Sequence, residues 1–368
     1  MSLAKNSPSE KIDENPKGID KEIIEKARAR LANKAVLITG GAGFIGSNLA
    51  FFFQEYFPST RVIVLDKFRD GSSFPNGNPT SLGHFKNLIG FNGEIIARDL
   101  NEGLDLLQEL DFDVVFHQAA ISDTTVENQK LMINTNHHAF LELLHIALKK
   151  NAVVVYASSA ATYGNTPAPN VVGKNEEPQN IYGFSKLAMD KSVRKILANA
   201  PHLPIFGLRY FNVYGGREFY KGKTASMILQ LGLQALESKK VRLIEKGEQK
   251  RDFVYIDDVV AANVLAMSEG FEMQKLDSIP KSGIYNVGTG LSRSYNEIVA
   301  ILKNHLGDFE VEYFKNPYPF FQTHTQADIQ PNASVLGYKP KYSLEQGIES
   351  YINEIKSIHT KLKSGLLS

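Results

Sequence analysis

A glycine-rich turn that joins an apolar run to a helix-forming stretch constrains the fold of this chain more than any other feature. The run Ala35-Val36-Leu37-Ile38 is typical of a buried parallel strand. It leads into residues 39–46, Thr-Gly-Gly-Ala-Gly-Phe-Ile-Gly, in which Gly40, Gly43 and Gly46 follow one another at intervals of three. In such a turn the first glycine permits tight bending, the second lets the backbone approach a pyrophosphate, and the third lets the helix pack on the strand.

The second predicted strand, Val62-Ile63-Val64-Leu65, ends in Asp66, about twenty residues after Gly46. A carboxylate at this distance from the turn is expected to bind ribose hydroxyls. The helix that follows the turn offers free N–H groups and the positive end of its dipole to phosphates. Strand, glycines, helix and acid in this order predict a dinucleotide-binding unit.

Strands alternate with helices over residues 34–210, which predicts an α/β fold, a Rossmann-type doubly wound parallel sheet. The pattern loosens beyond this point, and residues 211–360 are expected to form mainly a smaller C-terminal substrate-binding lobe, parts of which interleave with the first domain. Residues 1–33 lie outside the pattern as an N-terminal extension. They form either a flexible segment or a short amphipathic helix with one apolar face of Ile23, Ile24, Ala27 and Leu31.

Composition limits the possible functions. A length of 368 residues suggests about two domains, and a formal net charge of +1 indicates neither nucleic acid nor an anionic membrane as a partner. The absence of Cys excludes disulfides, thiolate catalysis and Cys-ligated zinc. Residues 1–34 lack the apolar core of a signal peptide, so the cytoplasm is the expected location. No metal site is expected, because the candidate ligands are adjacent on a helix or isolated: His117, His137, His138 and His324.

Tyr182 and Lys186 lie four residues apart in a stretch expected to be helical to about residue 198. Side chains at this spacing share a helix face and can meet. An ammonium beside a phenol favours the phenolate and moves the tyrosine pKa from about 10 toward the range of a working base. A tyrosine that removes a hydroxyl proton, beside a nicotinamide that takes the hydride, can oxidise an alcohol.

Several separate runs between about residues 34 and 356 resemble those of extended short-chain dehydrogenases/reductases that modify nucleotide sugars. They are residues 39–46, 117–120, 158–164, 181–186, 209–215 and 251–255. The resemblance implies that Ser159 orients the substrate alcohol or relays its proton, and that Tyr182 is the general acid/base. It also implies that Lys186 lowers the Tyr182 pKa and bonds the nicotinamide ribose.

The loop at residues 217–226, Arg-Glu-Phe-Tyr-Lys-Gly-Lys-Thr-Ala-Ser, resembles more narrowly that of the ADP-L-glycero-D-manno-heptose 6-epimerase family, as does the run 325–328. This resemblance implies transient oxidation of ADP-D-glycero-D-manno-heptose at C6 by one tightly bound NAD(P) per subunit, in the supply of heptose for the lipopolysaccharide core. Lys221 matches the second acid/base group of that family. To act so, it needs desolvation or a cationic neighbour, Arg217 or Lys223, to depress its pKa.

The same resemblance assigns the binding residues. Besides Tyr182 and Lys186, those implied for the cofactor are Gly40, Gly43, Phe44, Ile45, Gly46, Asp66, Lys67, Arg69, Asp99, Leu100, Gln118, Ala119 and Ala120. Those implied for the substrate are Ser159, Asn212, Arg217, Lys223, Arg251, Tyr318 and Phe321. The planar fork of Arg251 suits a diphosphate. We expect a small-molecule ADP-heptose partner and a homo-oligomer.

The sequence indicates a bound dinucleotide more clearly than it distinguishes NAD from NADP. Asp66 suits a free ribose 2′-hydroxyl and favours NAD. Lys67 and Arg69 follow it closely enough to neutralise a 2′-phosphate, and the resembled family prefers NADP. We therefore predict NADP, with NAD as the alternative.

Some positions depart from the family pattern. Gly216 stands where proline usually follows Tyr-Gly, and Ser73 stands where a lysine could reach the cofactor phosphate. Phe321 stands where a substrate-contacting tyrosine is expected, a role that Tyr318 could take. These departures bear on substrate and cofactor contacts more than on the type of reaction.

Other functions remain open. A UDP-hexose 4-epimerase would share Ser159, Tyr182 and Lys186 but would not need the Lys221 loop. A cofactor-binding scaffold or sensor is the non-enzyme alternative, because a fold alone does not determine function.

Overall fold

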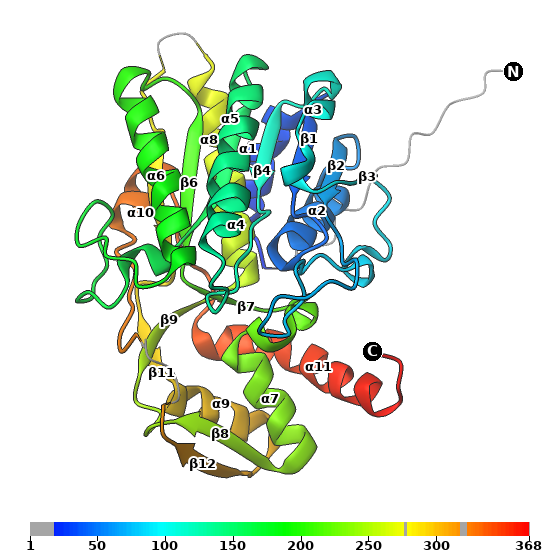
Figure 1. Cartoon of the computed structure of the whole chain (residues 1–368), viewed down its shortest axis with the longest axis vertical. Coiled ribbons are helices and arrows are strands. Elements are labelled where there is room, and N and C mark those ends of the chain that lie inside the picture. Colours follow the sequence, from blue (N-terminus) through cyan, green and yellow to red (C-terminus); the bar gives the residue numbers. More distant parts are fainter. Residues whose placement is uncertain (1–17, 276–277, 317–321, 368) are drawn as a thin grey trace, which may run out of the picture.

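The computed structural model describes residues 18–275, 278–316 and 322–367 of the chain. Its main body is a seven-stranded parallel sheet in the order β10-β6-β5-β4-β1-β2-β3 (Figure 1). These strands are β1 (Ala35–Thr39), β2 (Arg61–Asp66), β3 (Glu94–Ala97), β4 (Val114–His117), β5 (Val153–Ser159), β6 (Ile205–Tyr210) and β10 (Gly283–Val287). The chain reverses its direction of travel across the sheet between β1 and β4, and such switch points are where α/β proteins bind ligands. The predicted Rossmann-type fold is confirmed.

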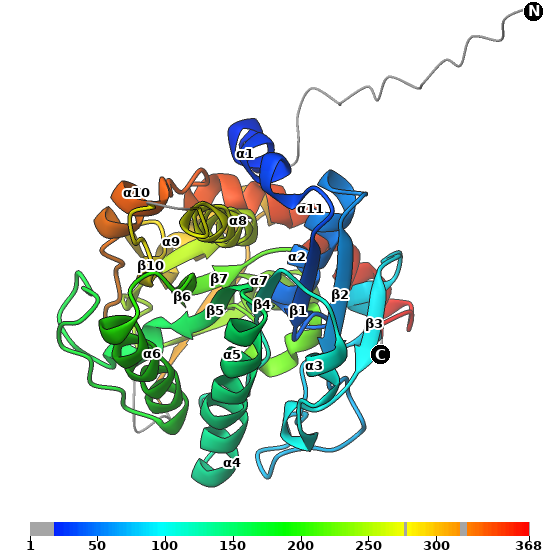
Figure 2. The same ribbon diagram turned by 90° about the horizontal axis from the view of Figure 1, so that it is seen from above.

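Helices cover both faces of the sheet, because its central strands are apolar on both sides. Seen from above, α2 (Phe44–Tyr56) and α8 (Ile256–Met273) lie on one face, and α5 (Ala139–Lys149) and α6 (Ile181–Asn199) on the other (Figure 2). Side chains of β1 alternate between the two cores: Val36 and Ile38 pack with α2 and α8, whereas Leu37 packs with α5.

The helical region over residues 129–149 contains a wider turn. It consists of α4 (Gln129–Ile133), a π-helical segment at Asn134–His138, and α5. Asn136, which is fully buried, lies in this segment. Its side-chain amide donates to the Ile121 carbonyl at 2.9 Å and to Ser185 Oγ at 3.0 Å, and its side-chain oxygen accepts from the Ile121 N–H at 2.8 Å. The wider turn thus ties the loop after β4 to α6.

The smaller lobe lies below the C-terminal ends of the main strands (Figure 1). One three-stranded sheet has the order β11-β9-β7, and β12 pairs with β8 in a second sheet. The elements of the lobe are β7 (Asn212–Tyr214), α7 (Met227–Ser238), β8 (Lys240–Ile244), β9 (Lys250–Tyr255), β11 (Ser292–Ser294), α9 (Tyr295–Leu306), β12 (Glu310–Phe314), and α11 (Leu344–Lys363). Between β9 and β11 the chain returns to the large domain to form α8 and β10.

The N-terminal helix α1 (Lys21–Leu31) packs against α8 on the outer side of the large domain (Figure 2). Its buried face consists of Ile24, Ala27 and Leu31. The remaining short helices are α3 (Leu106–Glu109) and α10 (Gln330–Leu336). In the part of the chain that the structure describes, no helix combines the length and the apolar character that a membrane crossing requires.

Candidate active site

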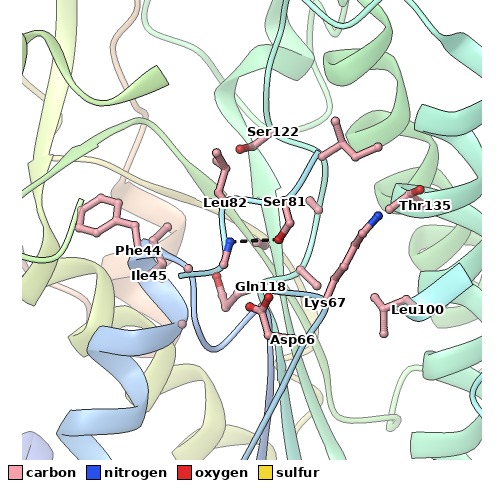
Figure 3. A pocket seen from close by; sticks show the side chains of 18 of the residues that line it. Phe44, Ile45, Asp66, Lys67, Ser81, Leu82, Leu100, Gln118, Ser122 and Thr135 are labelled. Carbon is pink, nitrogen blue, oxygen red and sulfur yellow. Dashed lines mark hydrogen bonds between the residues drawn. The ribbon is translucent and has the colours of Figure 1, made fainter. Parts of the chain in front are cut away.

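A cavity of about 370 Å³ lies at the C-terminal ends of β1, β2, β4 and β5 (Figure 3). It brings together residues that are far apart in the sequence, including the glycine turn, the Tyr182 helix and the Lys221 loop. The predicted site residues that line it are Gly40, Gly43, Phe44, Ile45, Gly46, Asp66, Lys67, Asp99, Leu100, Gln118, Ala119, Ala120, Ser159, Tyr182, Lys186 and Lys221.

The glycine turn has the geometry that a phosphate cradle requires. Gly40 has a φ of +68°, and a Cβ there would lie 2.6 Å from the Ala119 nitrogen. A Cβ on Gly46 would lie 2.2 Å from the Gly40 carbonyl oxygen, so only glycine lets α2 approach the turn this closely. The first N–H groups of α2 belong to Phe44, Ile45 and Gly46, which line the cavity. These features fit the pyrophosphate of a dinucleotide.

Asp66 is hydrogen-bonded to the backbone around the turn. Its carboxylate accepts from the Ala42 N–H at 3.0 Å and from the Phe68 N–H at 2.8 Å, and a Cβ on Gly83 would lie only 2.0 Å away. Burial raises the pKa of Asp66, and the two backbone hydrogen bonds oppose that rise. The carboxylate therefore holds the turn together at the ribose end of the cavity.

The two predicted phosphate-neutralising cations are placed differently. Lys67 lines the cavity and forms an ion pair with Asp99 at 3.1 Å (Figure 3). Arg69 does not line it and donates to the Tyr220 carbonyl oxygen instead. Arg98, which sequence reasoning missed, also lines the cavity on this side, and its guanidinium donates to the Glu102 carbonyl oxygen at 2.6 Å and to that of Gly103 at 3.3 Å.

Lys186 is buried at the base of the cavity. Its Nζ donates to the Ala157 carbonyl oxygen at 2.7 Å. Burial lowers the pKa of Lys186 to about 8, and the nearby Asp190 carboxylate opposes this shift. The ammonium group is thus held by the strand end next to Ser159.

Tyr182 and Ser159 meet because α6 begins very close to the turn that follows β5. Asn180 caps α6 by accepting from the Gly183 N–H at 2.8 Å. A Cβ on Gly183 would lie 2.4 Å from the Ala161 carbonyl oxygen, so a larger residue would push the helix away. Burial raises the pKa of Tyr182, and a hydrogen bond with the Ser159 hydroxyl lowers it. The Lys186 ammonium donates to the Ala157 carbonyl oxygen, and the lowering of the Tyr182 pKa by Lys186 stays a prediction.

Lys221 enters the cavity from the short helical segment Phe219–Thr224 of the smaller lobe. Its Nζ lies 5.5 Å from the centroid of the Phe44 ring. Desolvation lowers the pKa of Lys221, while the charge of Glu218 raises it. Glu218 is itself fully buried and accepts from the Ser226 N–H at 2.8 Å and hydroxyl at 2.7 Å, which fixes the base of the loop.

The two cationic neighbours predicted for Lys221 do not lie beside it in the cavity lining. The Arg217 guanidinium donates to the Asn87 carbonyl oxygen at 2.7 Å and lies 3.7 Å from the centroid of the Phe51 ring. Lys223 is exposed. Burial, rather than a neighbouring cation, therefore depresses the Lys221 pKa.

The Lys221 loop is fastened to the large domain. Tyr220 stacks on His84, with ring centroids 3.8 Å apart and an interplanar angle of 7°. Asn48 donates to the Gly216 carbonyl oxygen at 3.0 Å. Residue 216, where the family proline is missing, is thus still held in place.

The remaining substrate residues predicted from the sequence lie elsewhere or outside the described part. Asn212 is exposed on β7, and Arg251 is buried on β9, where it donates to the Lys250 carbonyl oxygen at 2.9 Å and to that of Gln322 at 2.5 Å. Neither contributes to the lining of this cavity. Tyr318 and Phe321 lie outside the described residues.

Sequence reasoning missed the loop that covers one side of the cavity. Phe74, Ser81 and Leu82 come from the long segment between β2 and β3. Ser122 lies near Ser81 and Leu82, and Thr135 lies near the end of Lys67 (Figure 3). Asp123 anchors this loop, accepting from the side-chain amides of Asn76 at 2.9 Å and Asn78 at 2.7 Å. The unusual length of this connection was the available signal.

The histidines considered above as metal ligands have other surroundings. His117 is fully buried, and its Nδ1 lies 2.8 Å from Thr39 Oγ1. Burial lowers the pKa of His117 to about 3, so it is neutral. Over the described residues, no three His, Cys, Asp or Glu side chains gather as a metal site would require.

Comparison with known proteins gives a consistent result. Residues 36–288 match the NAD dependent epimerase/dehydratase family. The ADP-L-glycero-D-manno-heptose-6-epimerase of Helicobacter pylori is 58% identical and superimposes with a TM-score of 0.79, covering 89% of this chain and 98% of that one. The UDP-N-acetylglucosamine 4-epimerase of Methanobrevibacter ruminantium is 28% identical, with a TM-score of 0.75 and coverage of 89% and 99%.

A further solved structure contains a bound cofactor. The UDP-glucuronic acid 4-epimerase of Bacillus cereus, solved with UDP-glucuronic acid and NAD, is 27% identical, with a TM-score of 0.71 and coverage of 88% and 99%. The motif-based resemblance to extended short-chain dehydrogenases/reductases is therefore confirmed. With its glycine turn, its Ser159, Tyr182 and Lys186 in one cavity, and the match over most of its length, the chain belongs to the NAD dependent epimerase/dehydratase family.

Proposed function

We propose that this protein is an ADP-glyceromanno-heptose 6-epimerase, an isomerase that interconverts ADP-D-glycero-D-manno-heptose and ADP-L-glycero-D-manno-heptose with a bound NAD(P). The observation that carries the proposal is that Lys221 lines the same cavity as Tyr182 while coming from a different lobe. Inversion of a centre needs proton transfer at both faces of the sugar carbon, and one tyrosine can serve only one face. The 58% identity to the Helicobacter pylori ADP-heptose epimerase supports the choice of sugar.

The residues of the cavity divide the chemistry between them. A bound nicotinamide dinucleotide supplies reversible hydride acceptance at C6 of the heptose. Tyr182 and Lys221 exchange a proton with the C6 oxygen, one as base when the alcohol becomes a ketone and the other as acid when the alcohol reforms. The Ser159 hydroxyl holds that oxygen, and the direction of reaction decides which residue acts first.

Proton NMR tests the proposal directly. Purified protein is incubated with ADP-D-glycero-D-manno-heptose, first without and then with added NADP or NAD. We expect the signals of the L-glycero epimer to appear, and their appearance without added cofactor would mean that the cofactor stays bound. An unchanged spectrum under every condition would contradict the heptose assignment.

Two comparisons separate this function from its alternatives. UDP-glucose incubated in the same way would give UDP-galactose if the protein were a UDP-hexose 4-epimerase. This alternative is tested because two of the similar structures are 4-epimerases of UDP-sugars. A scaffold or sensor would bind the cofactor and exchange no hydride with either sugar. Tyr182→Phe removes the proton-exchanging hydroxyl and is the inactive control.

We propose further that the cofactor is NADP, with Lys67 and Arg98 neutralising the 2′-phosphate. Both line the cavity near Asp66, whose carboxylate accepts two backbone N–H groups. Lys67→Ala should weaken NADP binding and leave NAD binding unchanged, as measured by calorimetry. Arg69→Ala, at a cation directed to the Tyr220 carbonyl, is the matched control. Equal loss of both cofactors in Lys67→Ala would rule out the phosphate contact.

A further inference from the structure

A row of side chains with alternating charge runs from the cavity into the interior beneath the catalytic tyrosine. It begins with Lys186 and continues through Asp190 to Arg209, whose Nη2 lies 2.7 Å from an Asp190 carboxylate oxygen. The same guanidinium nitrogen lies 2.7 Å from Glu176, which in turn pairs with Arg194 at 2.6 Å. The side chains of Asp190 and Arg209 are fully buried. Two buried charges of this kind are costly unless each has partners.

Asp190 organises the strand end that holds Lys186. It lies one helical turn beyond Lys186, which itself lies one turn beyond Tyr182, so the three share a face of α6. Its two carboxylate oxygens accept from Tyr156 Oη and from Ser158 Oγ, both at 2.9 Å. These residues flank Ala157, whose carbonyl oxygen receives Lys186 Nζ. Asp190 therefore fixes the backbone atom on which the ammonium rests.

Asp190 is also the anion that faces Lys186. Over the described residues, no carboxylate forms an ion pair with Lys186 within 4.0 Å, so the influence of Asp190 acts over a longer distance. The other titratable groups around this region are Tyr182 on α6, His117 on β4, Tyr156 on β5, Tyr163 in the turn after β5, His137 in the π-helical segment, Arg209 on β6, and Glu176, which pairs with Arg209 and Arg194. Without Asp190, Lys186 would lose the anion that raises its pKa, and Arg209 would keep only Glu176 as a partner.

We propose that Asp190 is a positioning residue of the active site, which holds the end of β5 in register for Lys186 and keeps Lys186 charged in its buried position. The proposal adds a function for Asp190 to the reaction proposed above and rests on Lys186 taking part in it. Arg209 and Glu176 serve the same arrangement, because the Arg209 guanidinium donates to an Asp190 oxygen at 2.8 Å and Glu176 pairs with the same guanidinium.

The proposal predicts in which direction the Lys186 pKa moves when Asp190 is replaced. The folded protein holds the pKa of Lys186 at about 8, below that of an exposed lysine, and Asp190 opposes a further fall. Removing the negative charge lowers that pKa further, so Lys186 loses its proton at a lower pH. Any step that needs the ammonium should then fail at a lower pH as the solution becomes alkaline.

Binding of reduced cofactor tests this without the sugar substrate, so its outcome is independent of the heptose assignment. NADPH fluorescence gives the dissociation constant between pH 6 and pH 9 for the unchanged protein and for Asp190→Asn. With a Lys186 pKa of about 8, affinity at pH 8 should be about twofold below its value at pH 6. If the substitution lowers that pKa by about one unit, the loss at pH 8 becomes about tenfold. If the affinity of folded Asp190→Asn for NADPH falls at the same pH as that of the unchanged protein, the proposal is overturned.

Three further variants separate charge from packing. Asp252→Asn removes another fully buried carboxylate, on β9, and should leave the pH dependence of NADPH binding unchanged. Asp190→Glu restores the charge and should move the alkaline loss back toward that of the unchanged protein. Tyr156→Phe removes one donor to Asp190 but keeps the carboxylate. If Asp190→Asn does not fold, a shift to lower pH in Tyr156→Phe as large as the one expected for Asp190→Asn would contradict the role given to the charge, because no negative charge has been lost.

Discussion

Burial drives the two residues proposed to exchange protons toward their neutral forms. It raises the pKa of Tyr182 and lowers that of Lys221. An un-ionised phenol can donate a proton, and a lowered pKa makes more of an amine available to accept one, so the two shifts favour opposite tasks. At Lys221 the charge of Glu218 opposes the shift caused by burial.

The second acid/base group can be tested with a matched pair of lysines. Lys221→Met keeps an unbranched side chain but removes the amine, and we expect the rate of C6 epimerisation to fall on the order of 10²–10⁴-fold. Lys223→Met, two residues further along the same loop at an exposed position, should change the rate little. Equal rates in the two variants, measured by NMR, would remove Lys221 from the mechanism.

Glu176 predicts a pH dependence of stability. Its contacts with Arg194 and Arg209 overcome the effect of burial and lower its pKa to about 2. Since the unfolded chain binds this proton more readily than the folded one, the stabilisation is present above the unfolded value near 4.5 and is lost as the pH falls toward 2.

Urea unfolding at pH 3 and pH 6 measures how much of the stability depends on ionised Glu176. Glu176→Gln should reduce the difference in the free energy of unfolding between the two pH values by up to about 2 kcal/mol. Glu177→Gln, one residue away and exposed, should leave the difference unchanged. If the difference between the two pH values falls equally in both variants, Glu176 is not the source of the pH dependence.

At the scale of elements, the turn before α2 is the most demanding unit of the fold. Gly46→Ala would place a Cβ 2.2 Å from the Gly40 carbonyl oxygen, and α2 would have to move away from the strand. We expect a loss of about 1–3 kcal/mol in the free energy of unfolding and much weaker NADP binding.

Gly283→Ala is the control for that change. Gly283 lies at the start of the edge strand β10, and a Cβ there would meet nothing closer than 3.6 Å, an ordinary contact distance. Thermal unfolding with and without NADP should distinguish the two variants. A Gly46→Ala protein that keeps both its stability and its cofactor affinity would show that the close approach is not needed.

The elements that a sequence predicts well are those specified by neighbouring residues. The strand, turn and helix around Gly40, and the face shared by Tyr182 and Lys186, depend on local spacing alone. The π-helical turn at Asn136 could not be predicted in this way, because its reason is a set of hydrogen bonds to Ile121 and Ser185.

The placement of single side chains shows the same limit. Arg69 follows β2 as a phosphate-neutralising cation would, yet its partner is Tyr220, 151 residues further along the chain. Arg217 is close to Lys221 in sequence, yet it contacts Phe51 and Asn87 in the large domain. The contacts of both arginines depend on how the two lobes pack together, and this packing cannot be predicted from the spacing of neighbouring residues.

At the scale of the whole molecule, α1 closes the outer core of the large domain. Ion pairs add to the contacts of its apolar face. Lys26 lies 2.5 Å from Glu269 of α8, and Arg30 forms an ion pair with Glu272. None of its residues lines the cavity. We therefore expect α1 to contribute to stability and not to catalysis.

Substitutions on the two faces of α1 test this expectation. Leu31→Ala removes a fully buried side chain and should lower the free energy of unfolding by about 2–5 kcal/mol. Glu25→Ala, on the exposed face, should change it by less than about 0.5 kcal/mol. Both variants should epimerise normally at a temperature where they remain folded, and a slower rate in folded Leu31→Ala would mean that α1 influences the active site.

The seventh strand, β10, has a consequence for engineering this family. It pairs with β6 yet lies between two parts of the smaller lobe in sequence, after β9 and before β11, and α8 precedes it on the outer face of the sheet. A chimaera that takes its sugar specificity from another epimerase cannot be made with one crossover after β6. The graft has to replace two separate segments, one before α8 and one after β10, and leave the stretch between them as it is.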